Sequence, residues 1–293
     1  MTRALVLSGG GSVGIAWQSG LVVGLAEAGV ALADADAVVG TSAGSAVGAQ
    51  IALGRDLSDQ IERYRSGGPA RGASAGAGGA GATAERMAKL MELMAGSVDA
   101  SPEERRRTIG RFALEADTGP EDGFVGAFGY LRGSPWPAGY SCTAVDAETG
   151  EFMVWKGQEG VELDRAVASS CSVPGLFPPI TINGRRYIDG GMRSGTNADL
   201  AKGHERVVII TLLTGSRTAM NAEWAARMQQ ARDAELQAIE SAGGTVHTVG
   251  PDEEAASVMG MNLMDGSRLL DAAEAGLRQG KQEADRLREF WGA

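Results

Sequence analysis

The chain has 293 residues, of which 43% are hydrophobic and 22% charged, a balance typical of one large globular domain or two small ones with a sizeable core. Its 37 acidic residues outnumber 27 Lys and Arg residues, so the net charge of −10 argues against binding to nucleic acid and against electrostatic docking on an anionic bilayer. Two cysteines and two histidines leave no material for a disulfide framework and little for a zinc site. Glycine is in excess, with 44 residues, about double its usual share of ~7%.

The apolar run near the N-terminus is too short to form the core of a signal peptide. Only the apolar residues 4–7 separate Arg3 from Ser8 and the glycines that follow it. No window approaches the ~20 apolar residues of a membrane span. We therefore expect a soluble, cytoplasmic protein whose two cysteines stay reduced.

Two strand–loop–helix units open the chain. An apolar strand at residues 4–7 leads through a glycine loop into a helix at 15–28, and a second strand at 37–39 leads through a serine-containing turn into a helix at 46–53. Two such units in succession are typical of an α/β fold with a parallel sheet.

The next segment predicts an insertion. Residues 67–82 are almost entirely Gly, Ala and Ser, which indicates either a mobile loop or a flexible linker without function. Helices are expected at 85–95, whose Met-rich face suits core packing or an adaptable surface over a substrate pocket, and from Ser101, where a Ser N-cap precedes Pro and two acids. We expect a single domain over 1–293, with the flexible loop and helical insertion at about 67–120.

The second half of the chain returns to strands. No internal repeat or clean domain break interrupts it. The predicted elements are a hairpin of strands 140–145 and 151–156, a buried strand at 206–213, a helix at 221–241, a strand at 245–249 and a closing helix at 267–290 capped by Ser267.

The strongest chemical motif is Gly40-Thr41-Ser42-Ala43-Gly44, between the second predicted strand and its helix. The pattern G-x-S-x-G in this context is typical of a nucleophile held on a sharp turn. The strained turn requires that Gly40 and Gly44 lack side chains. It exposes the Ser42 hydroxyl at a helix N-terminus, whose dipole favours developing negative charge.

The first glycine loop has two interpretations. Gly9, Gly11 and Gly14 match the spacing of a dinucleotide-binding loop, which would indicate an oxidoreductase. That site needs an acidic residue at the end of the second strand, whereas Asp34 and Asp36 precede the strand. Alternatively, bare backbone N–H groups form an oxyanion hole, in which one donor is worth ~3–4 kcal/mol. The neighbouring serine turn favours the oxyanion hole.

A nucleophilic serine also needs a base. His204 lies in a polar turn and His247 inside a predicted strand, and both positions suit ordinary structural histidines. Asp189 ends a predicted strand and precedes Gly190 and Gly191, so it offers a carboxylate base, although Asp-Gly-Gly also fits a plain tight turn.

Taken in order, these segments resemble the patatin-like phospholipases. The stretch 168–179, Ala-Ser-Ser-Cys-Ser-Val-Pro-Gly-Leu-Phe-Pro-Pro, is similar to that family's Ala-Ser-x-Ala-x-Pro-x-x-Phe-Pro-Pro. With the glycine loop, the serine turn and Asp-Gly-Gly, it gives four landmarks in order over residues 4–191. The resemblance fades beyond about residue 215.

The resemblance implies a three-layer α/β/α fold with a mainly parallel central sheet and a helical insertion after the nucleophile helix. It implies hydrolysis of lipid or small acyl esters, of phospholipase A, lysophospholipase or esterase type, without cofactor or metal and with at most peripheral membrane contact. Acyl transfer and a catalytically silent lipid-binding module remain alternatives, and the oligomeric state is open. The implied site is a Ser42–Asp189 dyad without histidine and an oxyanion hole from the backbone of Gly9, Gly10 and Gly11 with Ala43.

The sequence departs from the family pattern at three places. Ser8 and Val13 replace the Asp and the basic residue often found in the glycine loop, which leaves the backbone donors in place. After Asp-Gly-Gly the family often has Asn-x-Pro, where this chain has Asn197-Ala198-Asp199, so we expect a differently shaped loop. Cys171 replaces a usual alanine and is expected to pack similarly.

Overall fold

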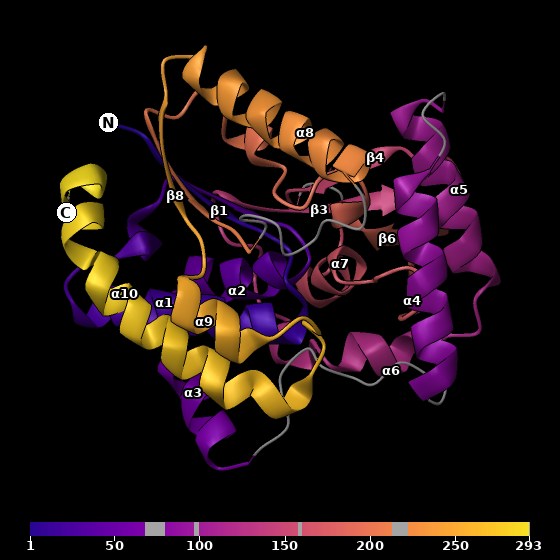
Figure 1. Ribbon diagram of the computed structural model, residues 1–293, viewed down its shortest axis with the longest axis horizontal. Helices are drawn as coiled ribbons and strands as arrows, with labels where there is room; N and C mark the ends of the chain where they lie inside the picture. The colour runs from indigo at the N-terminus through magenta and orange to yellow at the C-terminus, as the bar shows by residue number, and fades with distance from the viewer. Residues whose placement is uncertain (68–79, 97–99, 158–159, 213–221, 293) are drawn as a thin grey trace.

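The computed structural model describes residues 1–67, 80–96, 100–157, 160–212 and 222–292 (Figure 1). The strands are β1 (Arg3–Leu7), β2 (Ala37–Gly40), β3 (Tyr140–Asp146), β4 (Phe152–Trp155), β5 (Ile180–Ile182), β6 (Arg185–Asp189), β7 (Arg206–Ile210) and β8 (Thr245–Val249). The helices are α1 (Gly11–Glu27), α2 (Ala43–Ala52), α3 (Ser58–Arg65), α4 (Ala80–Ala95), α5 (Pro102–Glu115), α6 (Glu121–Gly126), α7 (Leu163–Ser170), α8 (Ala222–Glu240), α9 (Glu253–Met259) and α10 (Leu269–Trp291).

The strands form a mainly parallel sheet, as predicted. Following hydrogen-bonded neighbours, their order is β5-β6-β3-β2-β1-β7-β8, and β4 also pairs with β3. β1 runs parallel to β2 and β7, β2 to β3, and β7 to β8. β4, β5 and β6 are antiparallel to their partners. Long connections containing helices join the parallel strands, as parallel pairing requires.

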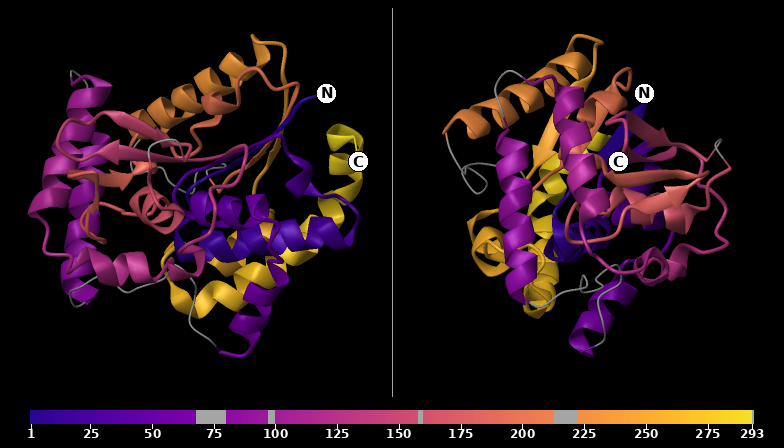
Figure 2. Two further views of the ribbon diagram at one scale, coloured as in Figure 1. Left: turned by 180° about the vertical axis from the view of Figure 1, so that it is seen from behind. Right: turned by 90° about the vertical axis from the view of Figure 1, so that its right-hand side faces the viewer.

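Helices cover both faces of this sheet and complete the predicted three-layer arrangement. Successive side chains of β1 alternate between two buried clusters: Leu5 and Leu7 pack on the side of α1 and α10, and Ala4 and Val6 on the side of α8. Figures 1 and 2 show α8 over one face and α1, α2, α9 and α10 over the other. Both faces of the central strands are therefore buried, which explains their continuous apolar sequences.

The predicted helical insertion contains α4 and α5, which stand beside β3 and β6 (Figure 1). α4 begins at Ala80, before the predicted residue 85, and residues 68–79 of the expected loop lie outside the described residues. α5 begins as predicted: the Ser101 hydroxyl accepts a hydrogen bond from the Glu104 amide, and the Glu104 carboxylate accepts one from the Ser101 amide.

Three more helix starts differ from the sequence prediction, and one of them is that of α2, which begins at Ala43 and not at residue 46. α1 begins at Gly11 and not at Ile15, because glycines lack the periodicity that marks a helix and yet tolerate its first turn. The closing helix begins at Leu269 and is not capped by Ser267. Asp265 caps the short turn before it, where its carboxylate accepts a hydrogen bond from the Ser267 amide at 3.0 Å.

Candidate active site

The pairing of β3 brings the predicted serine turn and Asp189 to one place. Gly40, the last residue of β2, pairs with Cys142, and Asp189, the last residue of β6, pairs with Ala144. Because Cys142 and Ala144 also both pair with β4, that strand occupies one edge of β3, and β2 and β6 share the other. The two strands run in opposite directions, so their carboxyl ends meet beside Thr143.

Ser42 has the backbone conformation expected of a nucleophile on a sharp turn. Its φ of 53° and ψ of −122° lie in a region that residues with side chains rarely adopt, and it caps the N-terminus of α2. The flanking glycines are sterically required: a Cβ at Gly40 would lie 2.4 Å from the Cα of Ser45, and one at Gly44 would lie 2.1 Å from the carbonyl oxygen of Leu7. Ser42 remains 8% exposed.

Three consecutive residues at the C-terminal end of α7 hold the backbone of both groups. The Ser42 amide donates to the Ser170 hydroxyl at 3.0 Å, and the Cys171 thiol donates to the Ser42 carbonyl at 3.1 Å. The Asp189 amide donates to the carbonyl of Ser172 at 3.0 Å. The stretch 168–179, which resembles the family sequence, therefore contacts the candidate site directly. Cys171 makes a hydrogen bond that the usual alanine would lack, beyond the similar packing expected from the sequence.

Asp189 has the environment of a general base. Its side chain is buried, and this burial raises the pKa of the Asp189 carboxyl to about 7 against the opposing effect of hydrogen bonds from the Ser42 hydroxyl and the Gly191 amide. The Gly191 amide lies 2.7 Å from Oδ1. A carboxyl group with this pKa is present in both protonation states near neutral pH, which suits a group that accepts and returns a proton.

The glycine loop approaches Ser42 closely, but its donors differ from the expected set. A Cβ on Gly9 would lie 3.9 Å from the Ser42 hydroxyl, so the loop borders this side chain. The Gly9 amide donates at 2.9 Å to the carbonyl of Gly195, which commits this expected oxyanion donor to the backbone. Gly10 is the N-cap of α1, Gly11 begins that helix and Ala43 begins α2, so their amides are among the donors that a helix leaves without an internal acceptor.

Residues 261–264, far along the chain, contact the other side of the glycine loop. The Leu263 carbonyl accepts a hydrogen bond from the Val13 amide at 3.0 Å, and a Cβ on Gly11 would lie 2.6 Å from the same oxygen. Val13, which replaces the family's basic residue, is fully buried. The sequence contained no signal for this contact because residues 261–264 form neither a motif nor a regular element.

A small pocket, partly open to solvent, is lined in part by Ser42. Its lining is mostly apolar, and Phe124 and Phe177 stack in its wall with ring centroids 4.3 Å apart. This composition suits an acyl group better than a charged ligand. The lining residues are Gly11, Ser12, Ile15, Ser42, Ala43, Phe124, Cys171, Val173, Phe177 and Met264.

The other candidate residues lie elsewhere. His204 contacts the carbonyl of Ala201, and His247 lies in β8 against Phe290, where burial lowers the pKa of its imidazole. The carboxylate of Asp36 accepts a hydrogen bond from the Arg3 amide at the start of β1, the end opposite the glycine loop, so it does not suit a dinucleotide ribose. Within the described ranges, no group of three or more His, Cys, Asp or Glu side chains is placed to bind a metal, and no helix has the length and hydropathy of a membrane span.

Comparison with known protein families assigns the chain to a family. The model of the patatin-like phospholipase family matches residues 5–202, which include every motif of the site. The chain belongs to this family. The match ends before β7, so β7, α8, β8, α9 and α10 of this patatin-like protein lie outside the matched region.

Individual relatives are distant. An uncharacterized NTE family protein of Mycobacterium tuberculosis is 28% identical over 201 residues, which are 67% of this chain and 27% of that protein, and a Mycobacterium bovis protein matches to the same extent. The match thus spans about a quarter of the length of these relatives. Among solved structures, VipD from Legionella pneumophila has a TM-score of 0.45 and 15% identity over 97% of this chain and 67% of that one. ExoU from Pseudomonas aeruginosa has a TM-score of 0.34 and 16% identity, over 96% and 53%.

Proposed function

We propose that this chain is a serine hydrolase of lipid acyl esters, of phospholipase A, lysophospholipase or esterase type. Membership of the patatin-like phospholipase family supports lipid acyl hydrolysis in general. The observation that carries the specific proposal is the meeting of the serine turn and the buried Asp189 at neighbouring positions of β3, with Ser42 in the lining of an apolar pocket.

In the proposed reaction Asp189 takes the hydroxyl proton of Ser42 while Oγ attacks the carbonyl carbon of the ester. Collapse of the tetrahedral intermediate breaks the bond to the alcohol, which leaves with the proton from Asp189. Water then attacks the acyl-enzyme as Asp189 accepts its proton. The carboxylic acid departs, and the proton returns to Ser42.

The negative charge on the carbonyl oxygen needs donors that are already in place. We propose the amides of Gly10, Gly11 and Ala43, since they lie at the N-termini of α1 and α2, where Gly11 and Ala43 line the same pocket as Ser42. Gly9 has a different role in this proposal. Its missing side chain leaves room beside Ser42, and its bond to Gly195 fixes the loop.

The proposal is tested by hydrolysis of p-nitrophenyl esters with short and long acyl chains. We expect Ser42→Ala and Asp189→Asn each to lose activity by a factor on the order of 10³ or more, as nucleophile and base losses do elsewhere. The matched controls Ser66→Ala and Asp122→Asn change exposed side chains and should match the wild type. Full activity in Ser42→Ala would contradict the proposal, and an inactive wild type would favour the silent lipid-binding alternative.

A further inference from the structure

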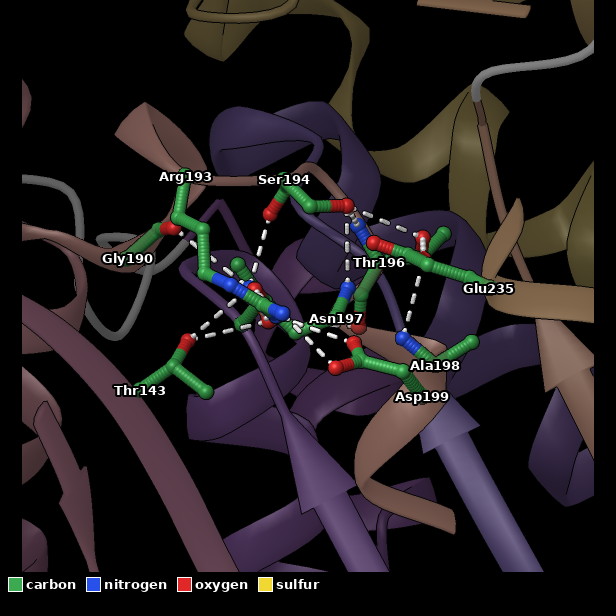
Figure 3. Close-up of polar contacts among 10 residues, drawn as sticks. Thr143, Gly190, Arg193, Ser194, Thr196, Asn197, Ala198, Asp199 and Glu235 are labelled. Carbon is green, nitrogen blue, oxygen red and sulfur yellow. Dashed lines mark hydrogen bonds and ion pairs between the residues drawn. The ribbon is translucent and has the colours of Figure 1, made fainter. Parts of the chain in front are cut away.

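A buried polar network includes the residue before Ser42 and the residue after Asp189, and most of its members are labelled in Figure 3. Its centre is Asn197, which is fully buried, as are Thr41 and Thr143. Asn197 belongs to the loop that follows Asp189, the segment in which this chain departs from the family pattern. Burial of so many polar atoms is costly unless each finds a partner, so the arrangement of their hydrogen bonds is informative.

The Asn197 amide group donates in two directions. Its Nδ2 lies 2.7 Å from the carbonyl of Ser194 and 3.0 Å from the Thr41 hydroxyl, with the carbonyl of Gly190 at 3.4 Å. Its Oδ1 accepts a hydrogen bond from Arg193 at 2.7 Å. The partners fix the orientation of the amide, because a flipped group would place Oδ1 against carbonyl oxygens.

These partners belong to both halves of the site. Thr41 precedes Ser42 in the serine turn, and Gly190 follows Asp189. We infer that Asn197 is a positioning residue that ties the serine turn to the aspartate loop and so sets the Ser42–Asp189 geometry. The inference rests on the proposed function, to which it adds a residue that touches neither the substrate nor the reacting atoms.

The loop around Asn197 is built to hold this position. Asn197 has a φ of 49°, a left-handed conformation that Asn tolerates better than most residues. Arg193 forms a two-pronged ion pair with Asp199 across the loop, at 2.7 and 2.9 Å. From α8, the carboxylate of Glu235 accepts hydrogen bonds from the Thr196 hydroxyl at 2.5 Å and the Ala198 amide at 3.0 Å.

The choice of substitution follows from this backbone. Asn197→Gly removes the amide group and keeps the left-handed conformation without strain. Asn183 provides a matched control, because it also has a positive φ, of 51°, but lies exposed in the turn between β5 and β6. Asn183→Gly therefore reports any general effect of the same change.

We expect Asn197→Gly to lower kcat on a p-nitrophenyl ester by a factor on the order of 10², the cost of displacing a catalytic group by about 1 Å. KM should change by less than about threefold, because Asn197 lies outside the pocket lining. If Asn197→Gly keeps the kcat of Asn183→Gly while Ser42→Ala is inactive, the inference is overturned and the proposed function stands.

Hydrogen exchange tests the coupling without activity. Loss of the tie should speed exchange in residues 41–45 and in residues 189–195 of Asn197→Gly, but not of Asn183→Gly. Unchanged exchange in both segments would overturn the inference, whether or not the wild type hydrolyses esters.

A second variant covers the case in which Asn197→Gly does not fold. Thr41→Val keeps the branched shape and removes the hydroxyl that accepts from Asn197. It should lower kcat and speed exchange in residues 41–45. Adding it to a folded Asn197→Gly should cost less than the sum of the two separate effects, since both changes break the hydrogen bond between Asn197 and Thr41. Wild-type kcat and exchange in Thr41→Val would overturn the inference.

Discussion

Ser42 concentrates the strain of the site in one residue. Its positive φ favours glycine, so the protein retains a side chain there at a cost in stability. We predict that Ser42→Gly is more stable to urea than Ser42→Ala by about 1 kcal/mol, although both lack the hydroxyl. Ser45, which lies within helix α2, gives the control, because Ala should there be more stable than Gly. If Ala were also more stable than Gly at position 42, the proposed backbone strain at Ser42 would be contradicted.

Asp189 should govern the pH dependence of the reaction. Only its ionised form accepts a proton, so kcat/KM should fall about tenfold per unit below its pKa of about 7 and level off above it. Since the folded pKa is raised, the contribution of Asp189 to stability is present below its ordinary pKa and is lost as the pH rises through about 7. The measurement is the pH profile of kcat/KM on a neutral ester. A flat profile from acid to neutral pH would count against Asp189 as the base.

At the scale of elements, the first strand–loop–helix units were predictable because their sequences carry complete local signals. The spacing of Gly40 and Gly44 around Ser42, between an apolar strand and a helical segment, is enough to predict the sharp turn. The meeting of β2 and β6 along one edge of β3 was not predictable, because it depends on pairing between segments more than forty residues apart. Asn197 and Leu263 were missed as site residues for the same reason.

The short helix α6 supplies one wall of the pocket through Phe124. Phe124→Leu removes part of the stack with Phe177 and enlarges the pocket, so we predict a preference shifted toward longer acyl chains by about tenfold. The measurement is the ratio of kcat/KM for long and short p-nitrophenyl esters. Phe128→Leu is the control, because Phe128 is equally buried and contacts Phe124 but does not line the pocket. Equal ratios in both variants would contradict a role of Phe124 in chain-length selection.

At the scale of the whole molecule, the C-terminal helix α10 packs closely against α1. A Cβ on Gly24 would lie 2.2 Å from the carbonyl oxygen of Leu277, and a Cβ on the facing Gly280 would lie 2.3 Å from that of Leu21. We predict that Gly24→Ala lowers the free energy of unfolding by about 1–3 kcal/mol, measured by urea denaturation. Gly123→Ala, in helix α6 with no atom within 4 Å, should be neutral or stabilising. An undiminished stability of Gly24→Ala would show that the two helices can move apart.

The excess of glycine also has a defined place in the whole molecule. Gly9–Gly14, Gly40, Gly44, Gly190 and Gly191 surround one serine and one aspartate, where their positions were predictable from motif spacing. Gly24 and Gly280 instead bring two helices together, which no local motif indicated.

Labelling with a fluorophosphonate ester tests the proposed nucleophile most directly. This reagent forms a stable bond to an activated serine and releases fluoride, and mass spectrometry of the intact protein and its peptides locates the adduct. We predict one adduct on Ser42 in the wild type, slower labelling in Asp189→Asn and none in Ser42→Ala. An unlabelled wild type, or an adduct that persists in Ser42→Ala, would contradict the assignment of Ser42 as the nucleophile.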